Sequence, residues 1–245
     1  MKKNQNFTMK FELILFDLDD TLMAFDLVGK DAWSKAIELF IKEENIQIEK
    51  KILLDKIQNT RKWYWGDIER HKQERKNIIN ARRQIAQLAL KDFLNIDREK
   101  LDDLAYDYTQ IHEKLWYLFE DVVATLELLK RKGIKLGIMT NGTSESQRGK
   151  LRRFDIEKYF DYFFIEGEVG YGKPDIRIYE YMLEVSKIPN NKIMMVGDNL
   201  VWDIEPPKKL GIATTWINTK GIDMNKTNIL PDNIIERISD VKNII

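Results

Sequence analysis

Hydrophobic and polar residues follow one another along this chain with two different periods. Short uninterrupted apolar runs, such as Leu-Ile-Leu-Phe at 13–16, are typical of strands buried inside a sheet. Beyond residue 119, these runs alternate with segments in which apolar residues recur every three or four positions, as in amphipathic helices. The expected strands are 13–16, 134–139, 162–165, 193–196 and 213–217, and the expected helices are 121–132, 145–154, 176–186 and a short one at 208–210. This alternation predicts a doubly wound α/β fold, a parallel sheet with helices on both faces.

Residues 26–118 have a different pattern, because helical periodicity continues there without a strand. Trp33, Ile37, Phe40 and Ile41 lie on one helical face, and the segment contains no proline. We therefore expect a bundle of about four helices inserted after the first strand. The predicted domains are an α/β core of residues 1–25 and 119–245 and a helical cap of residues 26–118. The tail 233–245 is expected to add a strand and a helix, with Ser239 as its N-cap.

Composition narrows the possible functions. Of 245 residues, 40 are lysine or arginine and 40 are acidic, so bulk charge predicts neither nucleic-acid nor membrane binding. The absence of cysteine excludes disulfides and thiolate catalysis. No run approaches the ~18 apolar residues of a membrane span, and the polar first ten residues do not resemble a signal peptide. We therefore predict a cytoplasmic location. His71 and His112 are too scattered for a histidine-rich metal site and are expected on helix faces or at the surface.

The residues that directly follow the predicted strands are rich in carboxylates and hydrogen-bonding groups. Ligands of open parallel sheets bind at the carboxyl ends of the strands, so these residues are expected to converge on one edge. Each piece alone is a common cap or turn, but their joint occurrence at four consecutive strand ends favours a functional site. The set consists of Asp17, Asp19, Asp20 and Thr21 after the first strand, Thr140, Asn141 and Gly142 after the second, Lys173 after the third, and Asp198 and Asp203 after the fourth.

This set resembles the haloacid dehalogenase superfamily of hydrolases. Its four motifs match Asp17-x-Asp19-x-Thr21, Thr140, Lys173, and Gly197-Asp198 with Asp203. The helical insert is similar to the cap of subfamily I, and the ~30 residues between the second and third motifs leave no room for another cap. The stretches Met194-Met-Val-Gly-Asp and Thr215-Trp-Ile-Asn218 resemble the nucleotidase and sugar-phosphatase branch.

The resemblance implies a Mg²⁺-dependent phosphatase that acts on a small phosphorylated metabolite, a nucleoside monophosphate or a sugar phosphate. Asp17 would be the nucleophile that forms an aspartyl-phosphate, and Asp19 the general acid and then the general base. The metal ligands would be the Asp17 carboxylate, the Asp19 carbonyl and Asp198.

The same resemblance implies roles for the remaining polar residues at the strand ends. Thr140, Asn141, Gly142 and Lys173 would bind the transferring phosphoryl group. Thr21 would brace the loop, and Asp203 would position Lys173 or a water on the metal. Asp20 is expected to be solvated or to cap a turn. Glu205-Pro-Pro207 departs from the family pattern, and we expect the following helix to start near Pro206.

Two other functions remain open from the sequence. A phosphomutase shares all four motifs and differs only in using a second substrate hydroxyl instead of water. A non-catalytic phosphate-sensing module would need a broken motif, and none is broken. A dehalogenase needs no leaving-group acid, so Asp19 favours phosphate-ester chemistry. The sequence does not specify the substrate or the oligomeric state.

One segment of the cap combines aromatic rings with cations. Residues 61–75 include Trp63, Tyr64 and Trp65, and Gly66 interrupts their helical pattern. The segment is expected to be a cap loop whose tryptophans pack on neighbouring helices. The alternative is that Trp63 or Trp65 stacks on a planar part of the substrate.

Overall fold

The computed structural model describes residues 10–219 and 221–245. The expected character of residues 1–9 therefore lies outside the described part of the chain. The chain divides into two compact units, one made of the residues up to Met23 with Leu118–Ile245 and the other of Ala24–Tyr117. The sequence places these boundaries at 25/26 and 118/119. Two short paired strands, β2 (Met23–Ala24) and β3 (Tyr117–Leu118), lie where the chain leaves the first unit and where it returns.

The first unit is built on a six-stranded sheet in the order β5-β4-β1-β6-β7-β8. All neighbouring strands are parallel, and in the centre Leu13 pairs with Lys135 of one neighbour and Ile193 of the other. The strands are β1 (Leu13–Phe16), β4 (Lys135–Thr140), β5 (Tyr162–Ile165), β6 (Ile193–Gly197), β7 (Ala213–Ile217) and β8 (Asn233–Ile235). The doubly wound α/β prediction is confirmed.

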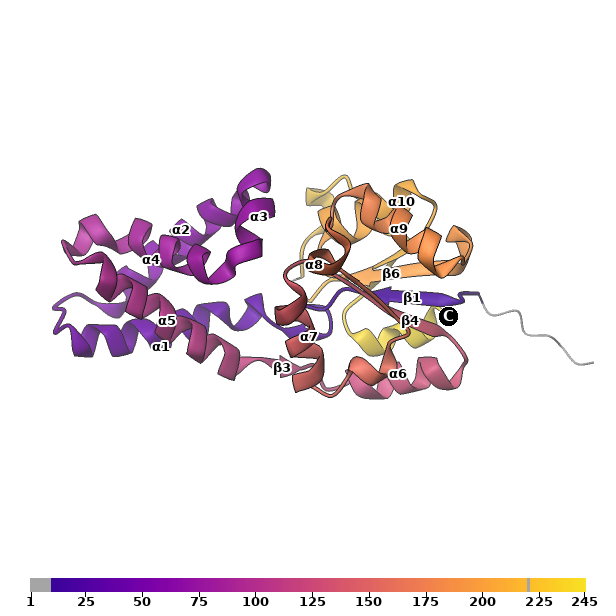
Figure 1. Ribbon diagram of the computed structural model, residues 1–245, viewed down its shortest axis with the longest axis horizontal. Helices are drawn as coiled ribbons and strands as arrows, with labels where there is room; N and C mark the ends of the chain where they lie inside the picture. Colours follow the sequence, from indigo (N-terminus) through magenta and orange to yellow (C-terminus); the bar gives the residue numbers. More distant parts are fainter. Residues whose placement is uncertain (1–9, 220) are drawn as a thin grey trace, which may run out of the picture. The chain divides into compact units, whose positions relative to one another are not determined.

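Helices cover both faces of this sheet. Figure 1 shows α6 (Val122–Arg131) on one face and α9 (Ile176–Ser186) and α10 (Glu205–Lys209) on the other. Two further helices, α7 (Ser144–Arg153) and α8 (Glu166–Val169), follow β4 and β5. β1 is buried at every position, so its uninterrupted apolar run is explained by helices on both sides.

The tail differs from the expectation in one detail. After β8 the chain forms a 3₁₀ helix, Ile238–Asn243, whose N-cap is Arg237. Ser239 lies inside the first turn and donates its N–H to the carboxylate of Asp121 over 2.9 Å. The predicted N-cap at Ser239 is therefore wrong, because the orphan N–H of the first turn is satisfied by a residue 118 positions away.

The second unit is a helical bundle. It contains α1 (Gly29–Glu43), α2 (Lys50–Gly66), α3 (Ile68–Glu74), α4 (Ile78–Leu94) and α5 (Arg98–Leu115). The four long helices share a core that includes Trp33, Phe40, Ile57, Leu90 and Leu104. The sequence did not predict the short helix α3 as a helix of its own.

The aromatic segment 61–75 is helical, so the expected loop is wrong. α2 continues to Gly66, and Asp67 caps α3 by accepting the N–H of Arg70 over 2.7 Å. The Trp63 ring is 59% exposed and has the Arg70 guanidinium 4.0 Å from its centroid. Trp65 packs against the bundle core and meets His71 edge-on. Packing therefore accounts for Trp65, whereas Trp63 is exposed and lies beside Arg70.

His112 lies on a face of helix α5, one of its two expected places, and this face is buried in the bundle and not at the surface. Its Nδ1 lies 3.0 Å from the Arg82 guanidinium, and its Nε2 lies 2.8 Å from the carbonyl of Phe25. A guanidinium only donates and a carbonyl only accepts, so the neutral ring with hydrogen on Nε2 satisfies both. Burial and the charge of Arg82 lower the pKa of His112 to about 4, against the raising effect of the Phe25 carbonyl.

We predict that His112 makes the bundle sensitive to acid. The unfolded chain takes up a proton near pH 6.5 and the folded chain does not, so stability is lost as the pH falls from 7 towards 4. Between pH 7 and pH 5 this contributes a loss of about 2 kcal/mol. Urea unfolding followed by tryptophan fluorescence should show a smaller loss in His112→Gln than in the wild type. His71→Gln should keep the wild-type pH dependence, and an identical dependence in His112→Gln would contradict the assignment.

None of the helices in the described part of the chain has the length and apolarity needed to span a lipid bilayer.

Candidate active site

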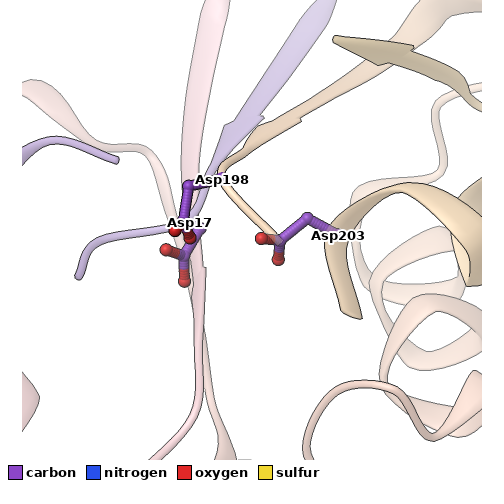
Figure 2. Close-up of side chains that lie close together, drawn as sticks. All are labelled: Asp17, Asp198 and Asp203. Atoms are coloured by element: carbon purple, nitrogen blue, oxygen red, sulfur yellow. The ribbon is translucent and has the colours of Figure 1, made fainter. Parts of the chain in front are cut away.

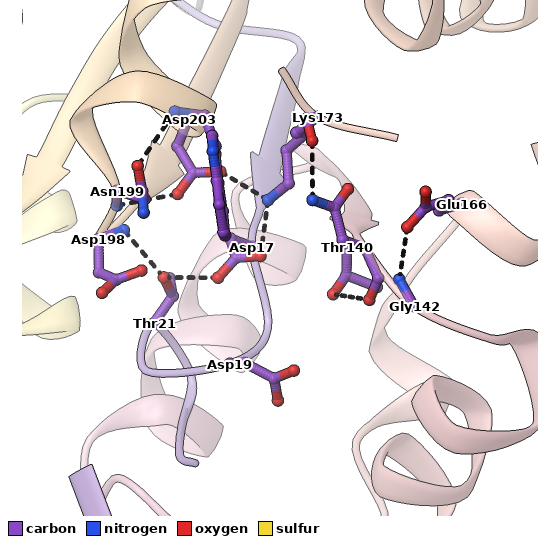
Figure 3. Close-up of polar contacts among 12 residues, drawn as sticks. Asp17, Asp19, Thr21, Thr140, Gly142, Glu166, Lys173, Asp198, Asn199 and Asp203 are labelled. Atoms are coloured by element: carbon purple, nitrogen blue, oxygen red, sulfur yellow. Dashed lines mark hydrogen bonds and ion pairs between the residues drawn. The ribbon is translucent and has the colours of Figure 1, made fainter. Parts of the chain in front are cut away.

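The strand order brings the polar strand ends together. β1 lies between β4 and β6. The chain adds β4 and β5 on one side of β1 and then β6, β7 and β8 on the other. Such a switch point leaves an opening at the carboxyl ends of the central strands. Figure 3 shows the residues that follow β1, β4 and β6, together with Lys173, meeting at this edge.

A buried lysine joins three of these loops. Lys173 is 1% exposed, and its Nζ donates to Oδ1 of Asp17 over 2.6 Å and to Oδ1 of Asp203 over 2.5 Å. Burial alone would lower the pKa of Lys173, but the two carboxylates raise it above the usual lysine value. Lys173 is therefore a fixed positive charge at the centre of the site.

Three carboxylates lie close together here, and two of them bind this single ammonium group. Asp17, Asp198 and Asp203 each offer an oxygen, and these oxygens lie within 4.8 Å of one another (Figure 2). Burial raises the pKa of Asp17 to about 8, Asp203 and Asp198 add to the rise, and Lys173 opposes it. A divalent cation would offset this excess of negative charge, and a donor set made only of oxygens suits Mg²⁺.

Thr21 connects the first loop to the fourth. Its hydroxyl donates to Oδ2 of Asp17 over 3.1 Å and accepts the N–H of Asp198 over the same distance. Trp216 of β7 supports Asp198 from the other side, since its indole N–H donates to the Asp198 carbonyl over 2.8 Å. Trp216 belongs to the stretch that resembles the nucleotidase branch, but the sequence assigned it no contact with Asp198.

Asp203 lies inside a π-helix, Leu200–Ile204, which continues directly into α10. The expected start near Pro206 is confirmed for α10, which begins at Glu205 with both prolines in its first turn, but the sequence did not predict the wider π-helical turn that precedes it. This wider turn carries the Asp203 carboxylate back to Lys173 and to the N–H of Asn199. A Cβ on Gly197 would lie 2.3 Å from that carboxyl carbon, so only glycine leaves room for it.

The Thr-Asn-Gly loop after β4 is held by side chains from two other segments. The Thr140 hydroxyl is buried and accepts the amide N–H of Gln147 over 2.7 Å. Asn141 donates to the Lys173 carbonyl over 2.9 Å, and its Oδ1 is buried without a hydrogen-bond partner. The Gly142 N–H donates to Glu166, so this N–H is already paired in the structure. The expected role of Gly142 in phosphoryl binding stays a prediction that would require Glu166 to release it.

Asp19 is separated from the buried carboxylates. Figure 3 shows its side chain directed away from Asp17 and Asp203. Both of its carboxylate oxygens contact Lys150 Nζ, at 2.8 and 2.7 Å, and Oδ2 also accepts from Gln147 over 3.2 Å. Asp19 is thus held by Lys150 and Gln147, while Asp17 is held by the central Lys173. The sequence analysis did not identify Lys150 or Gln147.

Asp20 occupies the turn after β1. Its backbone has a φ of +61°, and its N–H donates to the carbonyl of Met23 over 2.7 Å. The residue is 4% exposed, so the expectation of a solvated side chain is wrong, while the turn position is confirmed.

With the fold and the site described, the chain can be placed in a family. The family model of haloacid dehalogenase-like hydrolases matches residues 11–211, and the chain belongs to this family of hydrolases.

Two relatives and one solved structure show how widely the similarity extends. The pyrimidine 5'-nucleotidase YjjG of Escherichia coli is 28% identical, over 86% of this chain and 87% of its own. The glyceraldehyde 3-phosphate phosphatase of Methanocaldococcus jannaschii is 29% identical, over 83% of each. The structure of the HAD-hydrolase YfnB from Bacillus subtilis, bound to magnesium, superimposes with a TM-score of 0.73 at 22% identity. That superposition covers 96% of this chain and 99% of the other.

We predict that Lys173→Met destabilises the first unit strongly. The variant leaves Asp17 and Asp203 buried without their partner, which typically costs about 3–5 kcal/mol. Protonation of Asp17 would recover part of this cost. Urea unfolding in a chelator-containing buffer measures the loss. The control Lys130→Met removes a partly exposed ion pair with Asp161 and should cost less than about 1 kcal/mol. Equal small losses in both variants would contradict the central role of Lys173.

Proposed function

We propose that this chain is a Mg²⁺-dependent phosphatase that hydrolyses a small phosphorylated metabolite, a nucleoside monophosphate or a sugar phosphate, through an aspartyl-phosphate intermediate. The observation that carries the proposal is the set of buried Asp17, Lys173 and Thr140 with half-buried Asp198 at one sheet edge, with the carboxylate of Asp19 held apart from it. The two curated relatives named above both carry the names of phosphate-ester hydrolases, although for different substrates.

Asp17 is the proposed nucleophile. One of its oxygens is bound by Lys173 and the other by Thr21, so its orientation is fixed before substrate arrives. Its attack on phosphorus forms the aspartyl-phosphate and breaks the bond to the leaving oxygen. Lys173 remains beside the carboxylate and stabilises the charge that the transferring group brings.

The metal site would consist of the Asp17 carboxylate, the Asp19 backbone carbonyl and Asp198. Mg²⁺ bound there would offset the negative charge of the carboxylates and lower the pKa of Asp17, so that the nucleophile is ionised near neutral pH. Asp203 bonds to Lys173 in the structure, which supports a role in holding that lysine in place.

Proton transfer falls to Asp19, and phosphoryl binding to the loop after β4. A protonated Asp19 would donate to the leaving alkoxide, and the resulting carboxylate would accept a proton from the attacking water. Thr140, with Asn141 and Gly142, would hold the phosphoryl oxygens. A cytoplasmic location stays a prediction from the sequence.

We predict phosphate release from para-nitrophenyl phosphate that depends on Mg²⁺. Excess chelator should abolish the activity and added Mg²⁺ should restore it, because two anions must otherwise approach each other unaided. Full activity in the presence of chelator would contradict the metal requirement.

We predict different effects for the two aspartates of the first motif. Asp17→Asn should abolish turnover of every substrate, since no nucleophile remains. Asp19→Asn should slow hydrolysis of an alkyl phosphate by about 10²–10⁴-fold, the usual size of a general acid–base contribution. Release of para-nitrophenolate should suffer less, because this leaving group barely needs a proton. Equal losses on both substrates in Asp19→Asn would exclude the general-acid role.

A screen of phosphorylated metabolites would identify the substrate class and separate hydrolase from mutase. It should include pyrimidine and purine nucleoside monophosphates, sugar phosphates and small phosphorylated acids. A hydrolase releases free phosphate from its best substrate with water as the sole acceptor. A mutase would instead return the phosphoryl group to a sugar hydroxyl and release little phosphate.

A further inference from the structure

Helix α7 carries a polar pair, Gln147 and Lys150, that lies outside the four sequence motifs described above. Gln147 and Lys150 are three residues apart and therefore lie on the same face of the helix. Both are buried, with exposures of 2% and 3%, although their side chains are polar. Burying an ammonium group costs free energy unless a carboxylate pairs with it. The residue that pairs with Lys150 therefore indicates the role of this lysine.

The partner of Lys150 is Asp19. Lys150 Nζ contacts both carboxylate oxygens at 2.8 and 2.7 Å, which restricts rotation of the carboxylate more than a single contact would. Gln147 adds a second restraint, because its Nε2 donates to Oδ2 of Asp19 over 3.2 Å. The same Nε2 donates to the hydroxyl of Thr140 over 2.7 Å. The amide of Gln147 thus bonds both to Asp19, which is proposed for proton transfer, and to Thr140, which is proposed for phosphoryl binding.

The loop that leads to α7 is itself fixed. Thr143 caps the helix by accepting the N–H of Ser146, and the preceding Gly142 is bonded to Glu166. The helix therefore starts at a defined place directly after β4, and Gln147 and Lys150 reach Asp19 from a rigid element. Asp19 is separated from them by 128 and 131 residues in sequence, so the contact is a property of the fold.

We propose that Lys150 and Gln147 are positioning residues that hold the carboxyl group of Asp19 where it meets the leaving oxygen and then the attacking water. The inference rests on the proposed function, since it assumes that Asp19 transfers the proton. No bond to Lys150 forms or breaks during the reaction. The proton moves from Asp19 to the leaving oxygen, and a proton from water later returns to Asp19. The two side chains maintain the geometry on which both transfers depend.

The test is a double-mutant cycle between Lys150 and Asp19. Lys150→Met should lower kcat for an alkyl phosphate by about 10- to 100-fold, the size of a small misplacement at a reacting centre, with KM changed by less than about twofold. In the background of Asp19→Asn, the same substitution should produce no further loss, because there is no longer a carboxyl group to position.

A residue on the same helix supplies the matched control. Arg148 forms ion pairs with Glu157 and Glu168, which have no assigned role in proton transfer, so Arg148→Met should keep the wild-type kcat on both substrates. Circular dichroism and thermal melting check the folding of each variant. If Lys150→Met does not fold, Lys150→Gln takes its place in the same cycle, with the same non-additive result expected.

Two results would overturn this inference, and both differ from a failure of the proposed function. If the loss from Lys150→Met multiplies with that from Asp19→Asn, the lysine acts through general stability and not through Asp19. If Lys150→Met leaves kcat unchanged, the contact has no role in the reaction. A wild-type protein that releases no phosphate from any ester would instead refute the proposed function itself.

Discussion

The ion pairs of the buried Lys173 with Asp17 and Asp203 are the interaction on which the site depends. They tie the loop after β5 to the ends of β1 and to the π-helix that follows β6. A charge this deeply buried persists only because two carboxylates satisfy it. In turn, the carboxylates can stay close to each other only because the lysine and, in our proposal, a divalent cation lie among them.

This arrangement places Asp17 and Asp19, which are two positions apart in the sequence, in different environments. Asp17 belongs to the central buried group, whereas Asp19 is partly exposed and is held by Lys150 and Gln147. Their environments therefore differ although one residue separates them. A nucleophile and a proton-transfer group need such different environments, and Figure 3 shows the two side chains directed apart.

The sequence predicted much of the α/β unit because its strands are short, apolar and punctuated by polar ends. β5 and α9 have the expected bounds, and the residues at the strand ends do converge. The errors lie where tertiary contacts override local signals. The prolines at 206 and 207 indicated correctly where α10 starts, but they gave no sign of the π-helix before them, which places Asp203 against Lys173. Gly66 suggested a loop, whereas the capping side chain of Asp67 starts a second helix there.

The residues around Asp19 could not be found from spacing alone. Lys150 in a charged helix is indistinguishable from the solvated lysines that surround it, and only the fold shows it to be buried. The same is true of Glu166, which pairs with Gly142, and of Trp216, which supports Asp198.

The central claim is that Asp17 accepts the phosphoryl group. The most direct measurement mixes the protein with a radiolabelled phosphate ester and Mg²⁺, quenches with acid and locates the label by peptide mapping. The account predicts an acid-stable, hydroxylamine-sensitive label on the peptide that contains Asp17, absent from Asp17→Asn. Label on a different residue, or steady phosphate release with no labelled protein under any quench time, would contradict it.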